Sequence, residues 1–146
     1  GVLTSIGTLA SSQGRPESLV VVPTRGFLYA AHIFPGTATG YSIGADGDLT
    51  ALSALGITTE SDASTLDPTG QHLLLLESGT SSGTLRSYVV SSTGALFLRD
   101  TATTGARSRE VVVDPSGRFV LVTNGGDFNP NDDLFGAPSF GLVSRA

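Results

Sequence analysis

The stretch VVVDPSGRFVLVTN, residues 111–124, decides the fold because its central turn occurs three times in the chain. In this stretch Pro115 and Gly117 separate two apolar runs. Proline presets φ and glycine tolerates φ > 0, so the pair favours a tight reversal between two strands. Pro23 and Pro68 open the equivalent turns, and the three prolines are separated by 45 and 47 positions. A spacing of this size indicates a structural repeat.

Two further landmarks recur in the same phase as the prolines. One is a Gly-x-Leu triplet, and the other is an aromatic residue six positions before that glycine. The triplets begin at Gly1, Gly47 and Gly94, and the aromatic residues are Tyr41, Tyr88 and, in the corresponding place near the end, Phe140. The landmarks divide the chain into repeats at residues 1–46, 47–93 and 94–146.

Each repeat predicts four short strands. The first is a continuous apolar run, which is typical of a strand buried on both faces. The second follows the proline turn, the third alternates apolar and polar residues, and the fourth follows a hairpin signal such as Asp46-Gly47. First strands are expected at 19–22 and 111–113, second strands at 27–31, 73–76 and 119–123, and fourth strands at 49–52 and 96–98.

Four strands in about 45 residues are the signature of a propeller blade. We therefore expect an all-β protein, a β-propeller of three four-stranded antiparallel blades. The alternative is a β-sandwich of twelve strands, but sandwiches do not repeat their turn chemistry at a fixed period.

The same residues carry a resemblance to a known family. The stretches 111–124, 20–31 (VVVPTRGFLYAA) and 41–52 (YSIGADGDLTAL) resemble the lactonase-type, or YVTN-type, propellers. That family includes 6-phosphogluconolactonase-like and carboxymuconate-cyclising enzymes, normally built from seven blades. The resemblance implies a propeller, with ligands bound at the mouth of the central channel.

Three blades do not close a ring, because closed propellers have about 4–8 blades. Two explanations stay open at this point. Either two copies of the chain join into a six-bladed ring, or the chain is a piece of a longer polypeptide that supplies the other blades.

Polar residues recur at two places where the resemblance implies a channel mouth. Nine positions after the landmark prolines stand His32, Glu77 and Asn124. Before the innermost strands stand Glu17, Asp62 and Arg109, with Arg107 nearby. Arginine can grip a carboxylate with two hydrogen bonds, and histidine or glutamate can move protons. A ring of such side chains would bind a ligand, although exposed strand ends are also commonly polar.

Two functions follow from these candidates. The first is a non-catalytic binding or scaffold module that presents its channel mouth or blade edges to a partner or to a small carboxylated ligand. The second is a lactonase- or muconate-cyclase-like segment that uses His32, Glu77, Arg107 and Arg109 on a small lactone or carboxylate. The family often carries a Pro-His-x-His-like stretch before the inner strand, and residues 107–109 read Arg-Ser-Arg instead. This departure favours the first function.

Other sites are weakly supported or absent from the sequence. Asp127, Asn129 and Asn131 alternate like the first ligands of a calcium loop, but the rest of the calcium-loop pattern is missing. We therefore name them only as candidates for a looser cation site. No phosphate-binding glycine loop precedes a helix, so no cofactor is expected.

Composition limits the partners. The net charge is −5 and only 8 residues are basic, which argues against a nucleic-acid surface. No apolar run approaches the roughly 20 residues that span a bilayer. The chain has no cysteine, and with its lack of lysine and methionine this composition suggests an extracytoplasmic or secreted protein.

Overall fold

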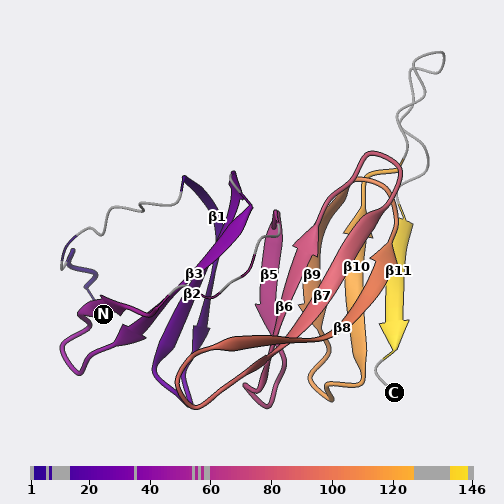
Figure 1. Cartoon of the computed structure of the whole chain (residues 1–146). Coiled ribbons are helices and arrows are strands. Elements are labelled where there is room, and N and C mark those ends of the chain that lie inside the picture. Colours follow the sequence, from indigo (N-terminus) through magenta and orange to yellow (C-terminus); the bar gives the residue numbers. More distant parts are fainter. Residues whose placement is uncertain are drawn as a thin grey trace.

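The computed structural model describes residues 2–5, 7, 14–34, 36–53, 55, 57, 60–126 and, for the backbone only, 139–144. These residues form three separate antiparallel sheets and no helix (Figure 1). The first sheet contains β1 (Arg15–Val22), β2 (Phe27–Phe34), β3 (Thr37–Ile43) and β4 (Leu49–Ala51). The second contains β5 (Ala63–Leu66), β6 (His72–Glu77), β7 (Gly83–Val90) and β8 (Leu96–Thr104). The third contains β9 (Ser108–Val113), β10 (Phe119–Asn124) and β11 (Ser139–Ser144).

The strands of each sheet are paired in chain order, which confirms the predicted all-β fold and its hairpins. Two of the sheets have the predicted four strands, whereas the described residues give the third sheet three. Residues 2–5, which include Val2 and Leu3 of the first Gly-x-Leu landmark, lie outside the strands. The fourth strand of the second sheet is longer than predicted and extends to Thr104.

Two of the three repeated proline turns, those at Pro68 and Pro115, are held by an aspartate that directly precedes the proline. Asp67 Oδ1 accepts hydrogen bonds from the backbone N–H groups of Gln71 (2.9 Å) and His72 (2.8 Å). Asp114 does the same for Phe119 N–H (2.7 Å), and hydrogen bonds, above all from the Ser116 hydroxyl, lower the pKa of Asp114. The ring of His72 also contacts Asp67, through Nδ1 and Oδ2 at 3.1 Å, so this histidine is part of the turn.

The three sheets stand side by side, with the second between the other two (Figure 1). Their first strands are neighbours, since β1 contacts β5 and β5 contacts β9. Ser18 of β1 and Ser64 of β5 share a hydrogen bond of 2.7 Å. The first strands therefore line the inner side of the array, and the fourth strands lie farther out.

Each sheet has two faces, and we name them by their neighbours. The trailing face points toward lower residue numbers, and the leading face points toward higher ones. In β6 the trailing residues Leu73 and Leu75 pack into one apolar cluster with the first sheet. The leading residues Leu74 and Leu76 pack into a second cluster with Val120 and Val122 of the third sheet. The core is thus two layers of side chains between three sheets.

The prediction that the first strands are buried on both faces is wrong for the outer sheets. In β1, Val20 and Val22 are buried, but Leu19 is 66% and Val21 49% exposed. In β9, Val111 is buried and Val112 is 50% exposed. Each of these strands has a packed neighbour on one side only, so alternate residues face solvent.

Candidate functional site

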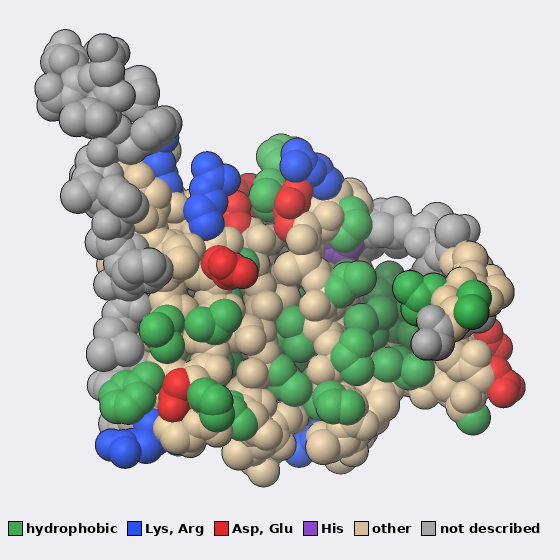
Figure 2. All heavy atoms as spheres, turned by 180° about the vertical axis from the view of Figure 1, so that it is seen from behind, with side chains coloured by type: hydrophobic (Ala, Val, Ile, Leu, Met, Phe, Trp, Pro, Cys, Tyr) green, Lys and Arg blue, Asp and Glu red, His purple; other side chains and the backbone are tan. Residues whose placement is uncertain are grey.

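The polar residues singled out from the sequence lie along one edge of the array, which we call the rim. The rim comprises the starts of β1, β5 and β9 and the ends of β2, β6 and β10, at the top of Figure 1. Antiparallel pairing joins these ends, as Pro16 is opposite His32, Ala63 opposite Leu76, and Ser108 opposite Asn124. Figure 2 shows arginine and acidic side chains gathered along this edge. The six predicted positions therefore share one edge: Glu17, His32, Asp62, Glu77, Arg109 and Asn124.

Glu77 is paired within its own sheet. Its carboxylate forms an ion pair with the guanidinium of Arg86 on the neighbouring strand β7. Both side chains are partly exposed, at 34% and 25%. Sequence reasoning missed Arg86, although its place two residues before Tyr88 puts it on the same face of β7.

Asp62 and Glu17 also have partners close to the rim. The Asp62 Oδ2 atom accepts a hydrogen bond of 2.7 Å from the backbone N–H of Ser78, which fixes the loop after β6. The Glu17 carboxylate lies 2.5 Å from Nε of Arg15.

Asn124 belongs to a buried polar network at the third sheet. Its Oδ1 accepts a hydrogen bond of 3.0 Å from the Ser108 hydroxyl, and Ser108 also lies 2.7 Å from the Thr104 hydroxyl. A Cβ at Gly105 would come within 2.7 Å of the Asn124 side chain, so glycine permits this close approach. The network joins β8, β9 and β10, and sequence reasoning did not find Thr104 or Ser108.

Arg107 holds an unusual backbone position between the second and third sheets. Its φ of 53° lies in the left-handed region, which non-glycine residues seldom adopt. Its N–H donates to Gly79 C=O (2.7 Å), and its C=O accepts from Gly125 N–H (3.0 Å). These bonds tie two rim loops together, and Arg109, two residues farther on, is exposed.

His32 is buried rather than presented at the surface. Its side chain is 0% exposed, and Nε2 lies 3.0 Å from the Thr39 hydroxyl. Burial lowers the pKa of His32, and a backbone hydrogen bond with Gly14 opposes this effect. The imidazole is therefore neutral at pH 7 and packed inside the first sheet.

Other predicted features lie away from the rim or outside the described residues. The candidate cation ligands Asp127, Asn129 and Asn131 fall outside the described residues. Within the described part of the chain, no three histidine or acidic side chains are close enough to hold a metal ion. The same part contains no helix with the length and hydropathy needed to cross a membrane.

Comparison with known proteins gives a structural likeness without a sequence family. No family model matches the chain, and no curated protein matches its sequence. A candidate 6-phosphogluconolactonase of Bacteroides fragilis superposes with a TM-score of 0.69 at 20% identity, over 94% of this chain and 44% of that protein. The periplasmic gluconolactonase PpgL of Pseudomonas aeruginosa gives 0.61 at 18% identity, over 77% and 37%. A Desulfotomaculum acetoxidans protein of unknown function gives 0.64 at 18% identity, over 93% and 44%.

These likenesses show that the chain has a lactonase-like, β-rich fold. The chain spans less than half the length of each of the three proteins.

Proposed function

We propose that the chain forms three blades of a lactonase-type β-propeller and serves as a non-catalytic binding module. The three sheets with adjacent first strands and the similarity to lactonase-like structures support the propeller arrangement. In this arrangement the rim is one mouth of the central channel. The propeller assignment is one of architecture, and the function rests on the rim residues.

One observation carries the non-catalytic assignment: the three acidic rim candidates each have a partner within the chain. Glu77 is paired with Arg86, Asp62 fixes the loop at Ser78, and Glu17 is paired with Arg15. A general acid or base must be within hydrogen-bond reach of a substrate proton and have a suitable pKa. The carboxylates instead serve as ion-pair and loop-fixing partners, and the only rim histidine among the described residues is buried.

The ligand that fits this rim best is a small carboxylate. Arg109 is exposed at the start of β9, one of the inner strands. A guanidinium binds a carboxylate through two parallel hydrogen bonds, which gives both attraction and orientation. Arg109 is thus the residue we assign to ligand contact.

A lactonase-like enzyme segment is the second candidate. Two structures similar to this chain carry lactonase names, one of them a gluconolactonase. In that case His32, Glu77, Arg107 and Arg109 would act on a lactone, and Glu77 would have to exchange its partner Arg86 for substrate. Muconate-cyclase-like chemistry would use the same residues on a small carboxylate.

Assays of lactone hydrolysis and of carboxylate binding distinguish the binding module from the enzyme. We expect the full chain to leave the spontaneous hydrolysis rate of gluconolactone and 6-phosphogluconolactone unchanged. We also expect saturable gluconate binding by calorimetry, weakened at least about 5-fold, or about 1 kcal/mol, by Arg109→Gln. Arg118→Gln is the matched control, because Arg118 lies at the opposite end of β10 over the Phe119 ring.

Two results would contradict the proposal. Catalysed hydrolysis that Glu77→Gln abolishes would replace it with the enzyme. Absence of gluconate binding, or equal weakening by Arg109→Gln and Arg118→Gln, would remove the carboxylate site.

A further inference from the structure

An asparagine followed by glycine stands at the rim, where Asn124 ends β10 and Gly125 follows. In such a pair the backbone nitrogen of the glycine attacks the side-chain amide readily, because glycine has no side chain to hinder the approach. The chain's other asparagines, Asn129 and Asn131, precede proline and aspartate. Proline has no backbone N–H to lose, and aspartate carries a side chain beside the nitrogen. The sequence therefore favours deamidation at Asn124 over the other two positions.

Deamidation closes a cyclic imide and then consumes water. The Gly125 nitrogen gives up its proton and bonds to Cγ of Asn124, the Cγ–Nδ2 bond breaks, and the amide group leaves with that proton as ammonia. Water then opens the imide at either of its carbonyls. Opening at the side-chain carbonyl gives aspartate, and opening at the main-chain carbonyl gives isoaspartate, in which the backbone runs through the side chain. Each product therefore has a carboxylate in place of the amide.

Both reacting groups are hydrogen-bonded in the folded rim. The Oδ1 atom of Asn124 accepts a bond of 3.0 Å from the Ser108 hydroxyl, and the Gly125 N–H donates a bond of 3.0 Å to Arg107 C=O. The first bond holds the amide in place, and the second keeps the proton on the nitrogen that would attack. Strand pairing adds a constraint, since Asn124 is opposite Ser108 in the ladder of β9 and β10. Ring closure therefore requires these bonds to break first.

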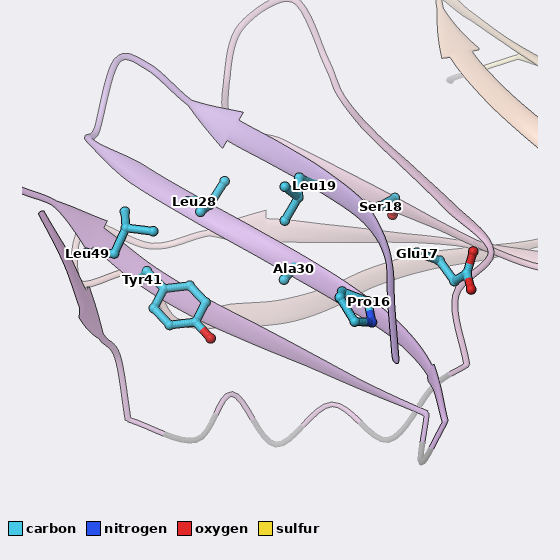
Figure 3. A pocket seen from close by; sticks show the side chains of 8 residues that line it. All are labelled: Pro16, Glu17, Ser18, Leu19, Leu28, Ala30, Tyr41 and Leu49. Atoms are coloured by element: carbon cyan, nitrogen blue, oxygen red, sulfur yellow. The ribbon is translucent and has the colours of Figure 1, made fainter. Parts of the chain in front are cut away.

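Asn124 is also enclosed between two sheets. It lies on the trailing face of the third sheet with Val122, and this face packs against Leu74 and Leu76 of the second sheet. The trailing face of the first sheet is instead an open groove of about 490 Å³ (Figure 3). Only 6% of Asn124 is exposed. Access of water to the amide therefore requires the second and third sheets to part at the rim.

A carboxylate at position 124 would disturb the contact that the amide makes. The Ser108 hydroxyl bonded to Asn124 lies 2.7 Å from the hydroxyl of Thr104, which ends β8 of the second sheet. A charge buried at this place costs free energy unless it is fully paired. Isoaspartate also lengthens the backbone before Gly125, which moves the Gly125 N–H away from Arg107 C=O. Either product is therefore expected to weaken the tie between the second and third sheets at the rim.

We propose that Asn124 is a deamidation site that the closed rim protects and that reacts with Gly125 when the second and third sheets part at their rim ends. The rate is then the rate in the open chain multiplied by the fraction of time that the rim is open. Because ammonia is lost, each event is permanent, and the carboxylate that it leaves favours further opening. Deamidation of Asn124 thus accumulates with rim opening, and it is independent of the proposed function.

The site is tested by incubating the full chain at mildly alkaline pH and locating, by tandem mass spectrometry, the asparagine whose amide becomes an acid. We expect Asn124 in the folded parent to react at least about 10-fold more slowly than in the same chain unfolded in guanidinium chloride, since only the open fraction reacts. Asn129 and Asn131 should react more slowly than Asn124 in the unfolded chain. Gly125→Ala should slow the reaction of Asn124 there, because a methyl group hinders the attacking nitrogen.

Protection by the rim is tested with Ser108→Ala, which removes the hydrogen bond to the Asn124 amide. We expect the folded variant to react about 5-fold faster than the folded parent, the effect of one lost hydrogen bond. Ser61→Ala is the matched control, because Ser61 is equivalent to Ser108 one repeat earlier and is 0% exposed. Its hydroxyl donates to Ala63 C=O at 3.0 Å, so this variant should react at Asn124 like the parent.

Circular dichroism identifies a variant that fails to fold, and Gly105→Ala then replaces Ser108→Ala. A Cβ at Gly105 would lie 2.7 Å from Cγ of Asn124 and displace the amide, so the same acceleration is expected. Equal rates at Asn124 in the folded and unfolded parent would overturn the inference, and so would an unreactive Asn124 in the unfolded chain. Folded Ser108→Ala and Ser61→Ala variants that react alike would show that the Ser108 bond does not protect the site.

Discussion

The second sheet and the first sheet have similar sequences but differ in burial. In β6, the four leucines at positions 73–76 are 0–2% exposed, because a sheet packs on each side. In β2, Tyr29 and Ala31 on the leading face are equally buried, while the trailing face forms an open groove. An apolar run in this repeat is therefore buried on as many faces as it has neighbouring sheets. The sequence pattern alone does not set that number.

The largest expected difference in stability is between variants that truncate equivalent leucines of the second and third sheets. Leu74→Ala removes a side chain that is 2% exposed in the contact with the third sheet, and we expect it to cost about 3 kcal/mol. Leu121→Ala alters the equivalent residue, which is 38% exposed, and should cost under about 1 kcal/mol in the single chain. Urea unfolding at low protein concentration measures both. Equal costs would contradict the difference in packing between the sheets.

Loss of the turn aspartate should likewise cost more stability in the second sheet than in the third. Asp67 is 3% exposed and accepts hydrogen bonds from Gln71 and His72. We expect Asp67→Ala to destabilise the protein by about 2 kcal/mol, because the N–H groups of Gln71 and His72 lose the partner that this buried carboxylate supplies. Asp114→Ala should cost less, since water replaces the lost bonds at that more exposed turn. Thermal unfolding of the two variants provides the comparison, and a larger loss for Asp114→Ala would contradict it.

Tyr29 tests the contact between the first and second sheets. Its hydroxyl donates to Gly94 C=O at 2.8 Å, and burial raises the pKa of Tyr29 to about 12. Tyr29→Phe should cost about 1 kcal/mol, the usual net value of one hydrogen bond. Tyr41→Phe is the control, because Tyr41 lines the open groove, and it should leave stability nearly unchanged at low protein concentration. If both variants unfold alike in urea, the Tyr29 bond is unimportant.

The smallest expected effect is a pH dependence from His32. Because burial lowers the pKa of His32, the unfolded chain binds a proton at this residue more readily than the folded chain. The contribution of His32 is complete above pH about 6.5 and is lost as the pH falls below that value. The parent should therefore lose more stability than His32→Gln between pH 7 and 5. Parallel losses in urea unfolding at the two pH values would show that His32 titrates normally.

Local features were predictable from the sequence because they depend on nearby residues. The Pro-x-Gly turn at Pro115 and the hairpin at Gly94 are fixed by φ preferences, so strand positions and antiparallel pairing followed. Exposure of Leu19 and Val112 was not predictable, because it depends on whether a further sheet is present.

The sequence predicted where the candidate site residues lie, but it did not predict their hydrogen-bond and ion-pair partners. The spacing from the landmark prolines placed His32, Glu77 and Asn124 at one edge. Their partners Thr39, Arg86 and Ser108 come from neighbouring strands and depend on the register between strands. A repeat alignment locates each position but carries no information about this cross-strand pairing.

The most direct test of the account is the accessibility of two equivalent positions that differ in the number of neighbouring sheets. The chain has no cysteine, so Leu121→Cys gives a single thiol on the exposed face of the third sheet, and Leu74→Cys gives one at the equivalent position in the contact between the second and third sheets. We expect a maleimide to modify Leu121→Cys much faster than Leu74→Cys in the folded protein. Equal rates would show that the second sheet is not packed between the other two, and would contradict the account.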